Sequence, residues 1–291
     1  MKVYAEVLPA TLGRAMHRIN RELRRQAPPE VEFVSHPAGA DLQILDVIGV
    51  GSFAYLALDD HVLLQHCYLT AETHEPEWWL QRFRRARLVM SYHDLPALTG
   101  ADDFPFYRAP WGVDGTVFAD QGLTRSVGVL TSGYDADGEA IFECFEAAAR
   151  LSIPAVHVGH DFGWPGVRFL EGVSDTQLAR CYSQARYVSG LRRGEGFELP
   201  VIEGLACGAR PICFDTPCYR HWFDGHAVFV PELGSAELVE ALVEVLMHQP
   251  APVTMVEREA LLNCFAWPRI FLGFWNRLMR TRDGGNVDSW R

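Results

Sequence analysis

Short apolar runs alternate with segments of helical periodicity along most of the chain. The first run, Val3–Leu8, predicts a strand, and Ala15, Ile19 and Leu23 then recur at helical spacing. Further strands are expected at 31–34, 42–48, 62–65 and 87–91, with a helix at 76–87. Such alternation is typical of βαβ units with parallel sheets, so the pattern predicts an α/β protein.

The alternation stops between residues 104 and 120, where proline, glycine and aromatic residues follow no regular period. This stretch indicates a connection between two domains, with the boundary near Gly112. We expect domains at 1–112 and 113–272 and a terminal helix and tail at 273–291. The second half contains expected strands and helices at 126–130, 138–151, 155–158 and 167–170, and an S-x-x-Q capping box at Ser174–Gln177 starts a helix that ends at Gln184.

Composition narrows the possible functions. A chain of 291 residues has room for two domains, and its formal net charge of -11 argues against a general binder of nucleic acid or anionic membranes. The arginines at 14–25 and 82–87 fit either two solvated helix faces or a surface for an anionic acceptor. The 7 cysteines form no C-x-x-C pair, and the longest uncharged run, 47–58, is too short to span a bilayer. We expect a cytoplasmic protein with no integral membrane segment.

The segment Gly194–Gly208 carries the most chemical information. Glu195 and Glu203 flank a predicted turn and helix start, and Pro200 and Gly208 place that helix at 200–207. The first N–H groups of a helix can hold a phosphate, and carboxylates accept hydrogen bonds from hydroxyls. A nucleoside diphosphate sugar offers both groups, so this segment predicts a site for such a donor.

The same segment resembles the E-x7-E signature of retaining glycosyltransferases of the GT-B fold, the "group 1" or family four class. Three more segments resemble motifs of that class: Ala109–Asp114 with Phe118 its P-N-G-V-D-x-x-x-F linker, Val173–Tyr182 its V-S-D-x-x-L-x-x-x-Y helix, and Phe265–Trp267 its F-S-W. The resemblance extends from about Val3 to Leu278. It implies two Rossmann-like domains facing across a cleft, with a C-terminal helix that returns toward the first domain. The first domain would hold the acceptor and the second the nucleotide sugar.

The resemblance also implies roles for single residues. Glu203 would bind the ribose hydroxyls and Glu195 the transferred sugar, with four residues near the sugar and phosphates: Gly196, Phe197, Glu198 and Leu199. Gly13 would belong to a loop near the phosphates, although an ordinary strand-to-helix turn also explains a glycine there. His66 would contact the sugar, unless it is a structural histidine. His157, His160 and Asp161 are weaker candidates for the border of the base or the cleft.

The sequence departs from the family at its phosphate-binding cations. The family's G-R-L is Gly128–Leu130 with valine in the middle, and its K-G is Asp137-Gly138. Arg192 and Arg193 are the nearest replacements, because a guanidinium can bind a phosphate through two hydrogen bonds. Glu198 stands where the family's E-G-F-G-L-P has glycine, and it either alters donor choice or points to solvent.

These observations predict a retaining glycosyltransferase that moves a hexose-like sugar from a nucleoside diphosphate to an acceptor hydroxyl. Its catalytic residues would be Glu195, His66, Arg192 and Arg193. The D-x-D at Asp135–Asp137 precedes a helix rather than ending a strand, so we expect neither a metal nor another cofactor.

Two rival functions remain. The alternative to the enzyme is a catalytically silent protein of the same fold that binds a nucleotide or assists a partner. Another GT-B chemistry, such as epimerisation, is disfavoured by the E-x7-E segment. The acceptor stays open among a saccharide, a lipid, a small molecule and a modified nucleic-acid base.

Overall fold

The computed structural model describes residues 1–5, 14–47, 60–65, 75–134 and 137–282. Contacts divide the chain into one compact unit of Met1–Trp111 with Trp267–Arg291 and a second of Gly112–Ala266. The last helix begins at Trp267 rather than at 273 and is grouped with the first unit. Its early start has a packing reason, because Trp267, Ile270 and Phe271 are buried.

The first unit is built on a six-stranded sheet in which every neighbouring pair is parallel. The strand order is β2-β1-β3-β4-β5-β6, with β1 Lys2–Ala5, β2 Glu32–Phe33, β3 Leu42–Val47, β4 His61–Gln65, β5 Leu88–Ser91 and β6 Phe106–Arg108. Its helices are α1 Arg14–Arg25, the 3-10 helix η2 Pro37–Gly39, α2 Pro76–Phe83, α3 Leu95–Thr99 and α10 Trp267–Arg282.

Several elements of this unit differ from the sequence prediction. The interrupted stretch 104–120 contains β6, which pairs with β5, and neither β6 nor α3 was predicted. Helix α2 ends at Phe83, four residues before the predicted end. On α1, Ile19 and Leu23 are buried as expected, whereas Ala15 is exposed.

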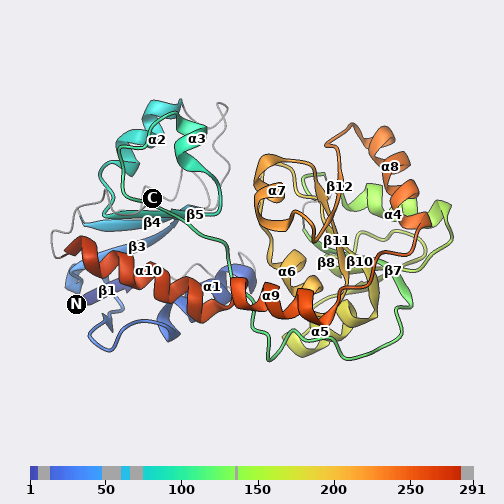
Figure 1. The fold of residues 1–291 in the computed structure, drawn as a ribbon, viewed down its shortest axis with the longest axis horizontal. Helices are drawn as coiled ribbons and strands as arrows, with labels where there is room; N and C mark the ends of the chain where they lie inside the picture. Colours follow the sequence, from blue (N-terminus) through green and yellow to red (C-terminus); the bar gives the residue numbers. More distant parts are fainter. Residues whose placement is uncertain (6–13, 48–59, 66–74, 135–136, 283–291) are drawn as a thin grey trace. The chain divides into compact units, whose positions relative to one another are not determined.

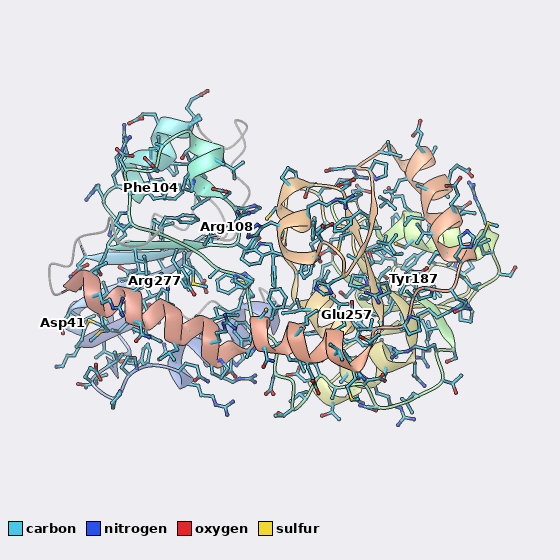
Figure 2. All side chains as sticks on the ribbon, viewed as in Figure 1. Asp41, Phe104, Arg108, Tyr187, Glu257 and Arg277 are labelled. Atoms are coloured by element: carbon cyan, nitrogen blue, oxygen red, sulfur yellow. The ribbon has the colours of Figure 1, made fainter. Side chains whose placement is uncertain are left out.

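Helix α10 lies beside α1 within the first unit (Figure 1). The indole nitrogen of Trp275, a fully buried residue, donates to the backbone oxygen of Leu23 at 3.1 Å. Arg277, labelled in Figure 2, places its guanidinium carbon 4.0 Å from the ring centroid of Tyr107. Helix α10 is therefore part of the core of the first unit.

The second unit contains another six-stranded parallel sheet, in the order β12-β11-β10-β7-β8-β9. The strands are β7 Val127–Gly133, β8 Ala155–Gly159, β9 Val167–Leu170, β10 Ala185–Gly190, β11 Arg210–Phe214 and β12 Val228–Val230. The helices are α4 Ile141–Arg150, α5 Asp175–Gln184, α6 Leu199–Ala206, α7 Pro217–Phe223, α8 Ser235–Met247 and α9 Met255–Phe265.

Local signals in the second unit produce the structure that they predict. Ser174 and Gln177 form the capping box at the start of α5, with hydrogen bonds of 3.2 Å and 2.8 Å. Two parallel Rossmann-like sheets confirm the α/β fold expected from the sequence. Within the described residues, we find no helix with the length and apolar character needed to cross a membrane.

Candidate functional site

In the sheet of the second unit the strand order reverses between β7 and β10, which are neighbours although β8 and β9 lie between them in the sequence. In open parallel sheets, ligands bind beside the carboxyl ends of strands at such a switch point. The segment after β7 contains Gly138 and Glu139, and the segment after β10 contains Arg192–Leu199. Arg193 donates its backbone N–H to the oxygen of Gly138 at 2.8 Å, which joins these two loops.

The second loop leads directly into α6, as its sequence predicts. The helix runs from Leu199 to Ala206, one residue earlier at each end than expected, with Pro200 in its first turn. Gly208 follows the C-terminal cap with φ +84°, a conformation that favours glycine. The first N–H groups of α6 have no acceptor within the helix, so this junction can bind an acceptor from a ligand.

Arg192 is the centre of a group of carboxylates at this edge. Its Nε lies 3.2 Å from Oε2 of Glu198, and its Nη1 lies 3.4 Å from Oε1 of Glu195. Its Nη2 pairs with Oε1 of Glu139 from the loop after β7. Burial lowers the pKa of Arg192, but the three carboxylates outweigh it and raise the pKa above its usual value. Arg192 is therefore a cation, and it bridges the two loops at the switch point.

Glu198 is the most deeply buried member of this group. Its side chain is only 4% exposed, so it does not point to solvent. One oxygen accepts a hydrogen bond from the hydroxyl of Tyr219 on α7, and the other faces Arg192. Burial raises the pKa of Glu198 to about 7, although Arg192 and the Tyr219 hydrogen bond act in the opposite direction.

Arg193 points to different partners. Its Nη1 lies 3.4 Å from Glu232 and its Nη2 lies 3.8 Å from Glu143 on α4. Both nitrogens also approach the oxygen of Leu233, and the guanidinium carbon lies 5.2 Å from the ring centroid of Phe214. The two adjacent arginines therefore contact different carboxylates, and Arg192 is the one that pairs with Glu195.

The remaining residues of the E-x7-E segment are packed into the second unit. Glu203 is buried, and its Oε2 lies 3.5 Å from the hydroxyl of Tyr182 on α5. Phe197 is buried and stacks on Phe223 with ring centroids 5.2 Å apart. A Cβ at Gly196 would overlap the side chain of Cys218, so this position requires glycine. Leu199, the first residue of α6, is also buried.

The other expected positions fall into two groups. Gly13 and His66 lie outside the residues that the structure describes. His157 is a buried structural histidine: its Nδ1 lies 2.8 Å from the hydroxyl oxygen of Thr131. Burial lowers the pKa of His157 to about 4. His160 is exposed and lies 3.8 Å from Glu171.

Sequence reasoning missed Glu139 and Tyr219, which complete the surroundings of Arg192 and Glu198. Glu139 adjoins the Asp137-Gly138 pair that stands for the family's K-G, so an additional carboxylate was visible there. No sequence pattern marks Tyr219, since it reaches Glu198 from a separate helix. Val129 is fully buried in the sheet, where it replaces the arginine of the family's G-R-L.

No metal site is visible in the described part of the chain, because it contains no group of three or more His, Cys, Asp or Glu residues arranged to hold an ion. What the edge of the sheet offers is one guanidinium among carboxylates beside a helix start. A guanidinium binds phosphate oxygens, and carboxylates accept hydrogen bonds from sugar hydroxyls.

Two sequence comparisons point to the same class of protein. Residues 142–262 match the family model described as "Glycosyl transferase-like". A "Putative glycosyltransferase ORF330" of Acidianus filamentous virus 2 (isolate Italy/Pozzuoli) is 23% identical over 199 residues. That match covers 62% of this chain, and the chain spans 55% of the length of this curated relative.

Solved structures share the fold at low sequence identity. Alr3699/HepE of Anabaena, crystallised with UDP, has a TM-score of 0.71 at 12% identity, covering 96% of this chain and 99% of that one. A glycosyltransferase of Rickettsia africae ESF-5 has a TM-score of 0.68 at 12% identity, with 96% and 98% covered. The sucrose-phosphate synthase of Thermosynechococcus elongatus has a TM-score of 0.65 at 16% identity, with 85% and 75% covered.

Proposed function

We propose that this chain moves a sugar from a nucleoside diphosphate to an acceptor hydroxyl. Its GT-B fold and the match of residues 142–262 to a glycosyl transferase-like family model support the proposal. The observation that carries the proposal is the position of Arg192, Glu195 and Glu198. They occupy the loop after β10, at the switch point of the sheet and directly before α6.

The E-x7-E segment supplies the groups that a nucleotide sugar needs. Glu203 accepts hydrogen bonds from the ribose hydroxyls, and Glu195 accepts them from the transferred sugar. The backbone from Gly196 to Leu199 adjoins the sugar and phosphates. Burial of Phe197 and the close approach of Gly196 to Cys218 support this role, because they hold the loop in one conformation.

Arg192 stabilises the departing diphosphate, because it is the guanidinium nearest to Glu195 in the described loop. Arg193 is the second candidate for this role, although its guanidinium pairs with Glu143 and Glu232. The reaction retains the configuration of the sugar, with attack from the face that the diphosphate leaves and without a protein nucleophile. The first unit holds the acceptor, and neither a metal nor a cofactor takes part.

UDP-glucose is the first donor to test, since an Alr3699/HepE structure contains it. Release of UDP and transfer of glucose are measured with saccharide, lipid and small-molecule acceptors, and then with GDP-, ADP- and dTDP-glucose. Glu195→Ala should abolish transfer. Glu240→Ala should not, because Glu240 is an exposed residue of α8 that pairs with Arg150 on α4. Transfer at the parent rate in Glu195→Ala would refute the assigned role. Loss of activity with a chelator, restored by magnesium, would refute the metal-free reaction.

One observation favours the silent alternative. Arg192 already pairs with three carboxylates, and the family's two cations are replaced by Val129 and Asp137. A silent protein would bind a nucleoside diphosphate, seen as a rise in melting temperature, and would neither transfer nor hydrolyse any of the four donors. Turnover of one donor rules this alternative out.

A further inference from the structure

Three carboxylates share the single guanidinium of Arg192. The two loops at the switch point bring Glu139, Glu195 and Glu198 to this one side chain. With all three ionised, negative charges outnumber positive ones by two. The diphosphate of a sugar donor adds further negative charge, and like charges repel strongly where water is excluded. Donor binding therefore needs a source of positive charge besides Arg192.

Glu198 is the carboxyl that can lose its charge most readily. Its side chain is 4% exposed, compared with 37% for Glu195 and 11% for Glu139. The ionisable groups that face it are Tyr219 on α7, Cys213 on β11, Arg192 and Glu195 in the loop after β10, and Glu139 in the loop after β7. Burial is the main cause that raises the pKa of Glu198 to about 7, and Glu195 and Glu139 add to it.

We propose that Glu198 takes up one proton when the diphosphate of the donor binds, and that this proton and Arg192 together replace the two cations missing from the site. The inference rests on the proposed function. Above neutral pH and before binding, Glu198 is ionised and faces Arg192 through Oε2. A phosphate oxygen then takes the place of Oε2 at the guanidinium, and a proton from the solvent adds to Oε2. The hydroxyl of Tyr219 continues to donate to Oε1.

The proton uptake fixes the sign of the pH dependence. A diphosphate beside Glu198 raises the pKa of this carboxyl further, so the bound state holds more protons than the free state above neutral pH. Affinity for the donor therefore falls as pH rises. For one proton the dissociation constant increases about tenfold per pH unit between the free and bound pKa values.

Calorimetric titration in two buffers of different ionisation enthalpy measures this proton directly. The probes are UDP-, GDP-, ADP- and dTDP-glucose, whose diphosphates exchange no proton between pH 7.5 and 8.5. The parent protein should take up close to one proton and show a dissociation constant that rises about tenfold over this range. Glu198→Gln should take up no proton, and its dissociation constant should change less than about twofold over the same pH range. Glu240→Gln, the same change at an exposed glutamate, should behave as the parent.

Tyr219→Phe provides a second test. This variant removes the hydroxyl that stabilises ionised Glu198, so the onset of the pH dependence should move to higher pH. Donor binding without proton uptake in the parent, or with equal uptake in Glu198→Gln, would overturn the inference and leave the proposed function standing. Failure of all four donors to bind at pH 6.5 would overturn both.

Discussion

Removal of one partner of the buried ion pair between Arg210 and Glu257 should strongly destabilise the second unit. The guanidinium of Arg210 meets both oxygens of Glu257, at 2.6 Å and 3.2 Å, and also donates to the backbone oxygens of His226, Ala251 and Pro252. The side chains of the pair are 9% and 16% exposed, and Glu257 is labelled in Figure 2. The pair joins β11 to the start of α9.

Arg210→Met removes one partner and leaves a carboxylate and three backbone oxygens without this donor. Breaking a buried pair in this way costs about 3–5 kcal/mol of unfolding free energy. Arg150→Met is the matched control, because Arg150 also pairs with carboxylates, those of Glu146 and Glu240, but its side chain is 45% exposed. Exposed pairs contribute about 0–1 kcal/mol. Urea unfolding followed by circular dichroism measures both differences.

The loss of unfolding free energy in Arg210→Met should depend on pH. Burial alone would raise the pKa of Glu257, but its hydrogen bonds from Arg210 and His226 lower it below the usual 4.5. The stabilisation is therefore present above pH 4.5 and is lost as pH falls through the lowered pKa. If Arg210→Met lost no more stability than Arg150→Met at pH 7, the reasoning from burial would be wrong.

Three further predictions test other parts of the chain. Gly196→Ala should lower the melting temperature and abolish nucleotide binding, because the new methyl group overlaps Cys218; an unchanged melting curve would contradict this. A maleimide at pH 8 should label the exposed Cys264 in the native protein, and Cys144 only after unfolding, because burial raises the pKa of Cys144 to about 12; peptide mass mapping distinguishes the two. Trp275→Phe removes the indole donor to a backbone oxygen of α1 and should cost about 1–3 kcal/mol in urea unfolding; a loss within about 0.5 kcal/mol would show that this hydrogen bond adds no stability.

The elements predicted best are those whose signals lie within the element itself. Pro200 and Gly208 place α6 to within one residue, and Ser174 and Gln177 place the start of α5. Strand β6 has no such signal, because three half-buried residues become a strand only by pairing with β5. Helix α10 starts earlier than predicted for a similar reason, since it packs against α1 and β5, which are distant from it in the sequence.

In the candidate site, too, features with a local sequence signal were predicted and features that depend on distant contacts were not. The sequence identifies Glu195 and Glu203 through their spacing, and the fold places their segment at the switch point of the sheet. It does not reveal that Arg192 would meet Glu139, because the strand order alone makes the loops after β7 and β10 neighbours. Nor does it show that Glu198 is buried, since the partner that Tyr219 provides belongs to another helix.

The position of Tyr219 links the packing of the second unit to the charge of the site. Its ring is buried beside Phe223, 6.4 Å between centroids, and its hydroxyl meets Glu198. A buried carboxylate without a donor would lose its charge at a still higher pH, because desolvation penalises the ionised form. The Tyr219 hydroxyl and Arg192 keep the pKa of Glu198 close to neutrality, where a single proton can be gained. Helix α7 thereby sets the pH range in which the proposed coupling between donor and proton operates.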